Sequence, residues 1–212
     1  MLFIFDWDGT LLDSADRIVA VMQLAISERG LPPLTNASIR NIIGLGLPEA
    51  LRMLYPDQPD MELKELQVAY SRHFVEAEDV PCKLFPGVEA TLDRLRADGN
   101  RLAVATGKSR RGLVRVLAGL GMSDYFDATR CADETRSKPH PLMLNELLAD
   151  LAVSAERAVM VGDTEYDMEM AVNAGMPRVA VDYGAHAVER LLPYKPGLVL
   201  SRFPDLLDWR WS

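Results

Sequence analysis

Short apolar runs alternate along most of this chain with stretches of helical periodicity, and this alternation limits the possible folds more than any other feature. Most of the runs are apolar at nearly every position, not at every second one, and the run at 126–131 is the weakest. A strand of this kind is buried on both faces, which is typical of a parallel sheet that helices cover on both sides. We expect six strands, at residues 2–5, 101–106, 126–131, 157–162, 178–182 and 198–200.

Amphipathic segments lie between the expected strands. Ser109 suits the N-cap of one helix, Pro141 suits the first turn of the next, and Gly175 suits the end of a third. We expect helices over residues 87–97, 110–120, 141–151 and 166–174. Alternation of strands and helices predicts an α/β fold with a doubly wound parallel sheet, which is a Rossmann-like core.

Residues 15–81 break this alternation, because they hold no convincing strand. Helical patterns occur instead at residues 16–28, 38–43, 48–54 and 61–78. We therefore expect an α/β core from residues 1–14 and 82–212, and a small α-helical cap domain from residues 15–81, inserted just after the first strand. The chain would cross between the two near residues 12–15 and 79–86, and these crossings would act as hinges.

Polar residues follow several of the expected strands directly. Asp6 and Asp8 follow the first strand, Thr106 and Gly107 the second, and Asp163 and Asp167 the fourth, while Lys138 lies in a loop before the helix at Pro141. Ligands bind to a doubly wound sheet at the carboxyl ends of its strands, near the point where the strand order reverses. We therefore expect these side chains to meet at one edge of the sheet.

The chemistry of this group points to a metal ion and a phosphate. Clustered carboxylates are costly unless a cation neutralises them. Hard oxygen ligands without thiolates favour Mg²⁺, which keeps several waters and commonly takes a phosphate oxygen. Thr106 and the amides of the Gly107 loop, at the start of a helix, can hold further phosphate oxygens, and Lys138 adds positive charge.

The overall charge narrows the class of partner. The net charge is −8 and the pI about 4.9, so we expect no nucleic-acid partner and no adsorption to an anionic membrane. The two cysteines, Cys82 and Cys131, are far apart in sequence, and we expect both to be free thiols in a reducing compartment. A disulfide between them is the alternative that the sequence leaves. No signal-like segment or apolar span appears, so the cytoplasm is the expected location.

Four short segments together resemble a known family. "DWDGT", "ATGK", "SKPHP" and "GDTEYDM" match, in order, the four motifs of the haloacid dehalogenase superfamily, and the resemblance covers essentially the whole chain. The helical insert resembles the first type of cap in that superfamily. Among its subfamilies the chain is most similar to the phosphoglycolate phosphatases.

The resemblance implies a role for each motif residue. Asp6 would be the nucleophile that forms an aspartyl-phosphate, and Asp8 would protonate the leaving oxygen and then activate water. Thr106, Gly107 and Lys138 would bind the phosphoryl group. Mg²⁺ would be held by Asp6, Asp163 and the main-chain carbonyl of Asp8, and Asp167 would orient Lys138 or a metal-bound water.

The function implied is a Mg²⁺-dependent phosphatase for a small phosphorylated metabolite, with 2-phosphoglycolate favoured. One alternative is a sugar-phosphate mutase of the same superfamily, although those relatives tend to carry a histidine close after the first motif and "LLDSADRI" has none. Another is a phospho-aspartate signalling or binding module. An EF-hand is disfavoured because the twelfth position from Asp6 is Arg17, where that loop needs glutamate.

The sequence of the cap contains few patterns that indicate which residues bind the substrate. In "IRNIIGLGLPEA", Arg40 could reach a substrate carboxylate, and Gly44 suggests a tight loop near the substrate. A solvated helix face is the alternative for Arg40. The oligomeric state is not predicted.

Overall fold

A six-stranded parallel sheet forms the centre of the molecule, in a computed structural model that describes residues 1–77 and 82–209. The strand order is β5-β4-β1-β6-β7-β8. The strands are β1 (Leu2–Phe5), β4 (Arg101–Thr106), β5 (Ala128–Cys131), β6 (Ala158–Gly162), β7 (Arg178–Val181) and β8 (Leu198–Leu200). The predicted α/β class with a doubly wound parallel sheet is confirmed.

Strand β1 is the pivot of the sheet. It pairs with β4 on one side and β6 on the other, so that Phe5 lies beside both Val104 and Val161. The chain builds outward from β1 through β4 to β5, and then crosses to build β6, β7 and β8 on the opposite side. The strand order therefore reverses at β1, which places the carboxyl ends of β1, β4 and β6 at the usual ligand-binding edge.

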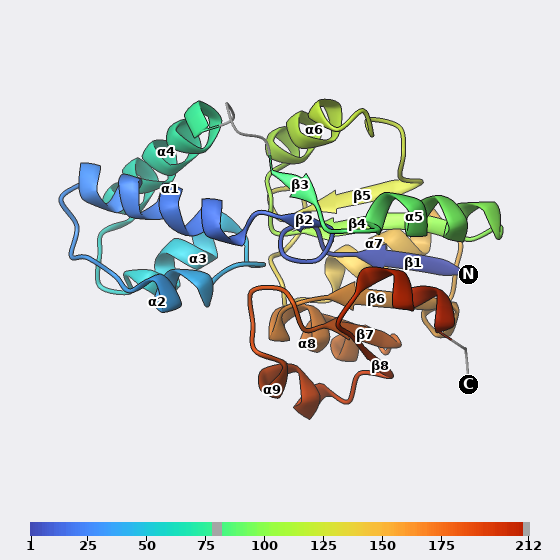
Figure 1. The fold of residues 1–212 in the computed structure, drawn as a ribbon. Coiled ribbons are helices and arrows are strands. Elements are labelled where there is room, and N and C mark those ends of the chain that lie inside the picture. Colours follow the sequence, from blue (N-terminus) through green and yellow to red (C-terminus); the bar gives the residue numbers. More distant parts are fainter. Residues whose placement is uncertain (78–81, 210–212) are drawn as a thin grey trace.

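Helices cover both faces of the sheet (Figure 1). Phe3 and Phe5 of β1 pack into one apolar cluster with α5 (Val88–Ala97), α6 (Arg110–Gly119) and the 3-10 segment Phe203–Asp208. Leu2 and Ile4 pack into another with α7 (Leu142–Asp150) and α8 (Glu165–Asn173). Because neighbouring residues of β1 serve opposite faces, every position of this strand is apolar and buried.

The insert after β1 is helical and lies at one end of the sheet (Figure 1). It consists of α1 (Ala15–Glu28), α2 (Asn36–Arg40), α3 (Leu47–Leu54) and α4 (Asp60–Glu76). These helices share an apolar cluster of their own, which includes Met22, Leu51 and Leu66. We call these four helices and the loops between them the cap.

A short antiparallel ribbon joins the cap to the sheet domain. Strand β2 (Leu12–Asp13) pairs with β3 (Lys83–Leu84), where the chain leaves the sheet and returns to it. The exact domain boundaries stay a prediction, and residues 79–81 of the second expected crossing lie outside the described residues. Two-residue strands are too short to show a periodic pattern, as is α9 (Val188–Leu191), and the sequence did not predict them.

Among the described residues, no helix is both long enough and apolar enough to cross a membrane.

The packing of the cap predicts a stability difference within a single helix. Leu66 of α4 is fully buried, whereas Val68 on the same helix is 63% exposed. We expect Leu66→Ala to lower the free energy of unfolding by about 2–5 kcal/mol, because it leaves a cavity. The matched control Val68→Ala should change it by less than about 0.5 kcal/mol. Urea denaturation measures both, and equal effects would contradict this account of the cap core.

Candidate active site

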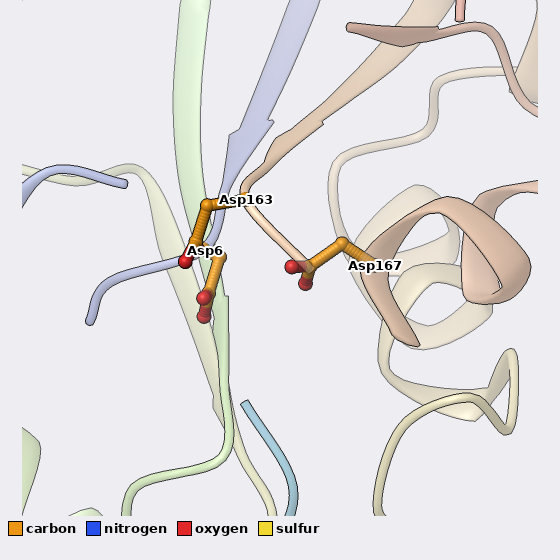
Figure 2. A group of neighbouring side chains, drawn as sticks. All are labelled: Asp6, Asp163 and Asp167. Carbon is orange, nitrogen blue, oxygen red and sulfur yellow. The ribbon is translucent and has the colours of Figure 1, made fainter. Parts of the chain in front are cut away.

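Three buried carboxylates meet beyond the ends of β1 and β6. Asp6 directly follows β1, Asp163 directly follows β6, and Asp167 lies in the first turn of α8. Figure 2 shows the three side chains turned toward one another. One oxygen from each lies within 4.8 Å of the others. The side chains of Asp6, Asp163 and Asp167 are 0–1% exposed, so their mutual repulsion is poorly screened by water.

A buried lysine lies between two of these carboxylates. Lys138 Nζ donates to Asp6 Oδ1 and to Asp167 Oδ1, each at 2.6 Å. Burial alone would lower the pKa of Lys138, but Asp167 and Asp6 together raise it above the usual lysine value. The ammonium therefore stays charged and offsets part of the repulsion among the carboxylates.

A capping box orients Asp167. Thr164, the N-cap of α8, accepts a hydrogen bond from the Asp167 amide, while Asp167 Oδ2 accepts from the Thr164 amide at 3.0 Å and from its hydroxyl at 2.7 Å. This pattern satisfies donors at the helix start that would otherwise lack partners. One oxygen of Asp167 is thus committed to the helix, and the other faces Lys138.

Asp163 is held by groups that the sequence analysis did not identify. Its Oδ1 accepts from the Thr10 hydroxyl and its Oδ2 from the Ala185 amide, both at 2.7 Å. Gly9, at φ +86°, packs so closely that a Cβ there would lie 2.2 Å from Asp163 Oδ2. The "Gly-Thr" that follows Asp8 was a visible signal, but nothing in sequence points to the Ala185 amide.

Asp8 is oriented through a single oxygen. Its Oδ1 accepts from the Ser14 hydroxyl at 2.6 Å and lies 3.0 Å from Lys108 Nζ. Ser14 directly precedes α1, and Lys108 belongs to the loop after β4. Sequence reasoning overlooked both residues, although Lys108 stands inside the quoted "ATGK" segment.

The loop after β4 approaches the same site. Thr106 is fully buried at the end of β4, and its hydroxyl accepts a hydrogen bond from the Lys108 amide at 3.2 Å. Gly107 packs beneath the cap, since a Cβ there would lie 2.3 Å from the Leu45 carbonyl oxygen. Any larger residue at this position would push the cap loop away.

The cap loop, residues 41–46, docks on several loops of the sheet domain. The Asn41 carbonyl accepts from the Tyr166 hydroxyl and from His186 Nε2, both at 3.0 Å. The Gly46 amide donates to the Ser137 hydroxyl at 2.8 Å. The structure therefore shows the cap seated over the strand ends.

A cavity of about 500 Å³ lies between the cap and the strand ends. The sheet domain lines it with Asp6, Asp8 and Gly107, among others. The cap residues that line it include Ile43, Tyr70 and Phe74. A space of this size suits a small molecule.

The structure brings most of the predicted site residues together, although their roles stay predictions. Asp6, Asp8, Thr106, Gly107, Lys138, Asp163 and Asp167 gather at the carboxyl ends of β1, β4 and β6. Gly44, at φ +99°, lines the cavity and packs on Thr164. Arg40 does not line this cavity, and its guanidinium pairs with Asp16 at an exposed position. That geometry favours the solvated-face alternative for Arg40.

The carboxylate cluster fits a divalent cation. Asp6 Oδ2 is buried and has no hydrogen-bond partner among the described residues. Burial raises the pKa of Asp6 well above its usual value, since Lys138 only partly opposes the burial and the neighbouring carboxylates. Burial also raises the pKa of Asp163 to about 7. A cation bound by these hard oxygen donors would replace the protons that the cluster otherwise retains.

The comparisons with known proteins all indicate the same family. The model for haloacid dehalogenase-like hydrolases matches residues 3–181. A phosphoglycolate phosphatase of Yersinia pestis is 32% identical over 208 residues, covering 96% of this chain and 90% of the relative. One of Rhodobacter capsulatus is 34% identical, covering 99% and 98%. The crystal structure of a putative haloacid dehalogenase-like hydrolase from Bacteroides fragilis superposes with a TM-score of 0.90 at 25% identity, covering 97% and 98%.

The raised pKa values predict how a cation and pH act together on stability. Burial raises the pKa of Asp163 from 3.8 to about 7, so its protonation stabilises the cation-free folded protein at low pH, and this contribution to stability is lost as pH rises between these values. With Mg²⁺ at roughly 100 times the Kd that it has at pH 8, the melting temperature should rise by roughly 5–10 °C at pH 8. The same Mg²⁺ concentration should raise it by much less at pH 5, where protons compete for the carboxylates.

Differential scanning calorimetry with and without Mg²⁺ measures this shift. Asp163→Asn should abolish it, because the variant lacks one anionic ligand. A shift of the same size at both pH values, or one that persists in Asp163→Asn, would contradict a cation site at this cluster.

Proposed function

This chain belongs to the haloacid dehalogenase-like hydrolase family and is a phosphoric monoester hydrolase, and we propose that it is a Mg²⁺-dependent phosphatase whose substrate is 2-phosphoglycolate or a close analogue. The proposal is supported chiefly by one arrangement: Asp6 and Asp8 line the same cap-covered cavity, and Lys138 holds one oxygen of Asp6. The names of the curated relatives favour this substrate.

In the first step, a carboxylate oxygen of Asp6 attacks phosphorus, and the bond from phosphorus to the substrate oxygen breaks. Asp8 gives the departing oxygen a proton, so the products are an alcohol and an aspartyl-phosphate at Asp6. Thr106, the Gly107 loop and Lys138 would surround the transferring group and offset its charge. The closed cap keeps bulk water away during this step.

In the second step, water attacks the same phosphorus atom while Asp8 takes its proton. The bond between phosphorus and the Asp6 oxygen breaks, which releases inorganic phosphate and restores both carboxyl groups. Splitting hydrolysis into two displacements replaces one difficult reaction with two easier ones. Mg²⁺, when bound by Asp6, Asp163 and the Asp8 carbonyl, would neutralise charge on the phosphoryl oxygens.

A small substrate suits the dimensions of the site. The cavity of about 500 Å³ lies beneath a docked cap, and a space of this size suits a small molecule. We propose that the protein binds neither nucleic acids nor membranes. Its cytoplasmic location stays a prediction.

A phosphate-release assay tests the proposed function. With Mg²⁺ we expect turnover of 2-phosphoglycolate, and Asp6→Asn should lower kcat by at least about 10³-fold because it removes the nucleophile. Asp57→Asn makes the same change at an exposed turn and should leave kcat unchanged.

Product analysis completes this test. Inorganic phosphate should be the only phosphorus-containing product, whereas an isomer of a sugar phosphate would indicate a mutase. Full activity in Asp6→Asn would contradict the assigned nucleophile. Turnover of other small monoesters, with none of 2-phosphoglycolate, would contradict only the substrate.

A further inference from the structure

Lys108 lies in the active site but has no role in the two reaction steps described above. Its ammonium lies 3.0 Å from Asp8 Oδ1 on one side and 4.7 Å from the centre of the Phe74 ring on the other. Asp8 belongs to the sheet domain, and Phe74 belongs to helix α4 of the cap. One side chain thus contacts both the expected proton donor and the cap that covers it.

The Lys108 backbone is fixed, so its side chain starts from a defined point. Its amide donates to the Thr106 hydroxyl at 3.2 Å, and its carbonyl accepts from the Ala132 amide at 3.1 Å. The side chains of Lys108 and Asp8 are only 12% and 9% exposed. A charge pair this sheltered from solvent interacts more strongly than a surface pair.

The contacts of Asp8 are arranged asymmetrically. Ser14 and Lys108 both approach Oδ1, and within residues 1–77 and 82–209 no hydrogen bond is found for Oδ2. Holding a carboxyl group by one oxygen orients the other. A proton donor must be within hydrogen-bond reach of the leaving oxygen, and small misplacements are costly.

The cap completes this arrangement. The face of an aromatic ring attracts a cation, most strongly where water is excluded. Phe74 therefore helps to hold the Lys108 ammonium against Asp8 when α4 is in place, and Tyr70 of the same helix packs at 5.8 Å from the Phe74 ring. If the cap moved away, Lys108 would lose one of its two contacts.

We propose that Lys108 is a positioning residue that couples the closed cap, through Phe74, to the orientation of Asp8 as the proton donor. The proposal rests on the proposed function, in which Asp8 protonates the leaving oxygen. It predicts that Lys108 matters most for substrates whose leaving group needs a proton.

Three substrates separate this role from others. Ethyl phosphate and 2-phosphoglycolate both release an alkoxide that needs protonation, and only the second carries a carboxylate. p-Nitrophenyl phosphate releases a stable phenolate that leaves without a proton. Values of kcat/KM report the steps through formation of the aspartyl-phosphate, so they isolate the step in which Asp8 acts as an acid.

We expect Lys108→Met to lower kcat/KM by roughly 30-fold for both alkyl phosphates and by less than about 3-fold for p-nitrophenyl phosphate. Lys108→Arg, which retains the charge, should recover most of the loss. Phe74→Leu, which keeps an apolar side chain but removes the ring, should show the same selectivity at about 3–10-fold. Lys64→Met makes the matched change at an exposed position of α4 and should alter none of the three.

Other outcomes would overturn the proposal. An equal loss on all three substrates would mean that Lys108 contacts the phosphoryl group directly. A loss confined to 2-phosphoglycolate would mean that it reads the carboxylate, and no loss would mean that the pair is structural. Circular dichroism spectra of each variant check folding, and Lys108→Arg and Phe74→Leu provide independent tests if Lys108→Met is unfolded.

Asp8→Asn, measured in parallel, separates failure of this proposal from failure of the proposed function. If Asp8→Asn shows the selective loss and Lys108→Met does not, only the role of Lys108 is wrong. If Asp8→Asn shows no selectivity, Asp8 is not the acid, so the role of Lys108 and the protonation step of the proposed mechanism are both wrong, while phosphate release still tests the phosphatase activity itself.

Discussion

The rest of the site depends on the pairing of the buried Lys138 ammonium with the carboxylates of Asp6 and Asp167. Three carboxylates crowd the ends of β1 and β6, and without a cation their repulsion and burial would favour protonation. Lys138 supplies one permanent positive charge by bonding Asp6 and Asp167 at once. That charge is insufficient for three carboxylates, which is why the raised pKa values of Asp6 and Asp163 favour a second cation.

The cap closes the site through its backbone as well as its side chains. The Asn41 carbonyl and the Gly46 amide bond to Tyr166, His186 and Ser137, and the Gly44–Leu45 backbone packs on Gly107. Backbone contacts of this kind require small residues and defined turns, and they place few demands on cap side chains. The side chains of the cap that line the cavity can therefore serve the substrate.

Much of the fold could be read from the sequence because its signals are local. Buried parallel strands appear as continuous apolar runs, and carboxylates that follow such strands must meet at one edge. Contacts between distant segments were harder to foresee. Nothing in the residue types of Ser14, Lys108 and Ala185 marks them as part of the site. Only the packed structure shows that Ser14 and Lys108 contact Asp8, and that the Ala185 amide contacts Asp163. For Arg40 the sequence left two alternatives open, and its pairing with Asp16 favours the solvated helix face.

In the proposed mechanism, Asp6 becomes phosphorylated during each turnover. The enzyme is mixed with Mg²⁺ and a phosphomonoester that it hydrolyses, and the reaction is quenched in acid. Borohydride then reduces any aspartyl-phosphate to homoserine. Peptide mass spectrometry then locates the modified residue. We predict homoserine at position 6 and aspartate at positions 8, 163 and 167. Homoserine at another position, or none at all under conditions where phosphate is released at the full rate, would contradict the account.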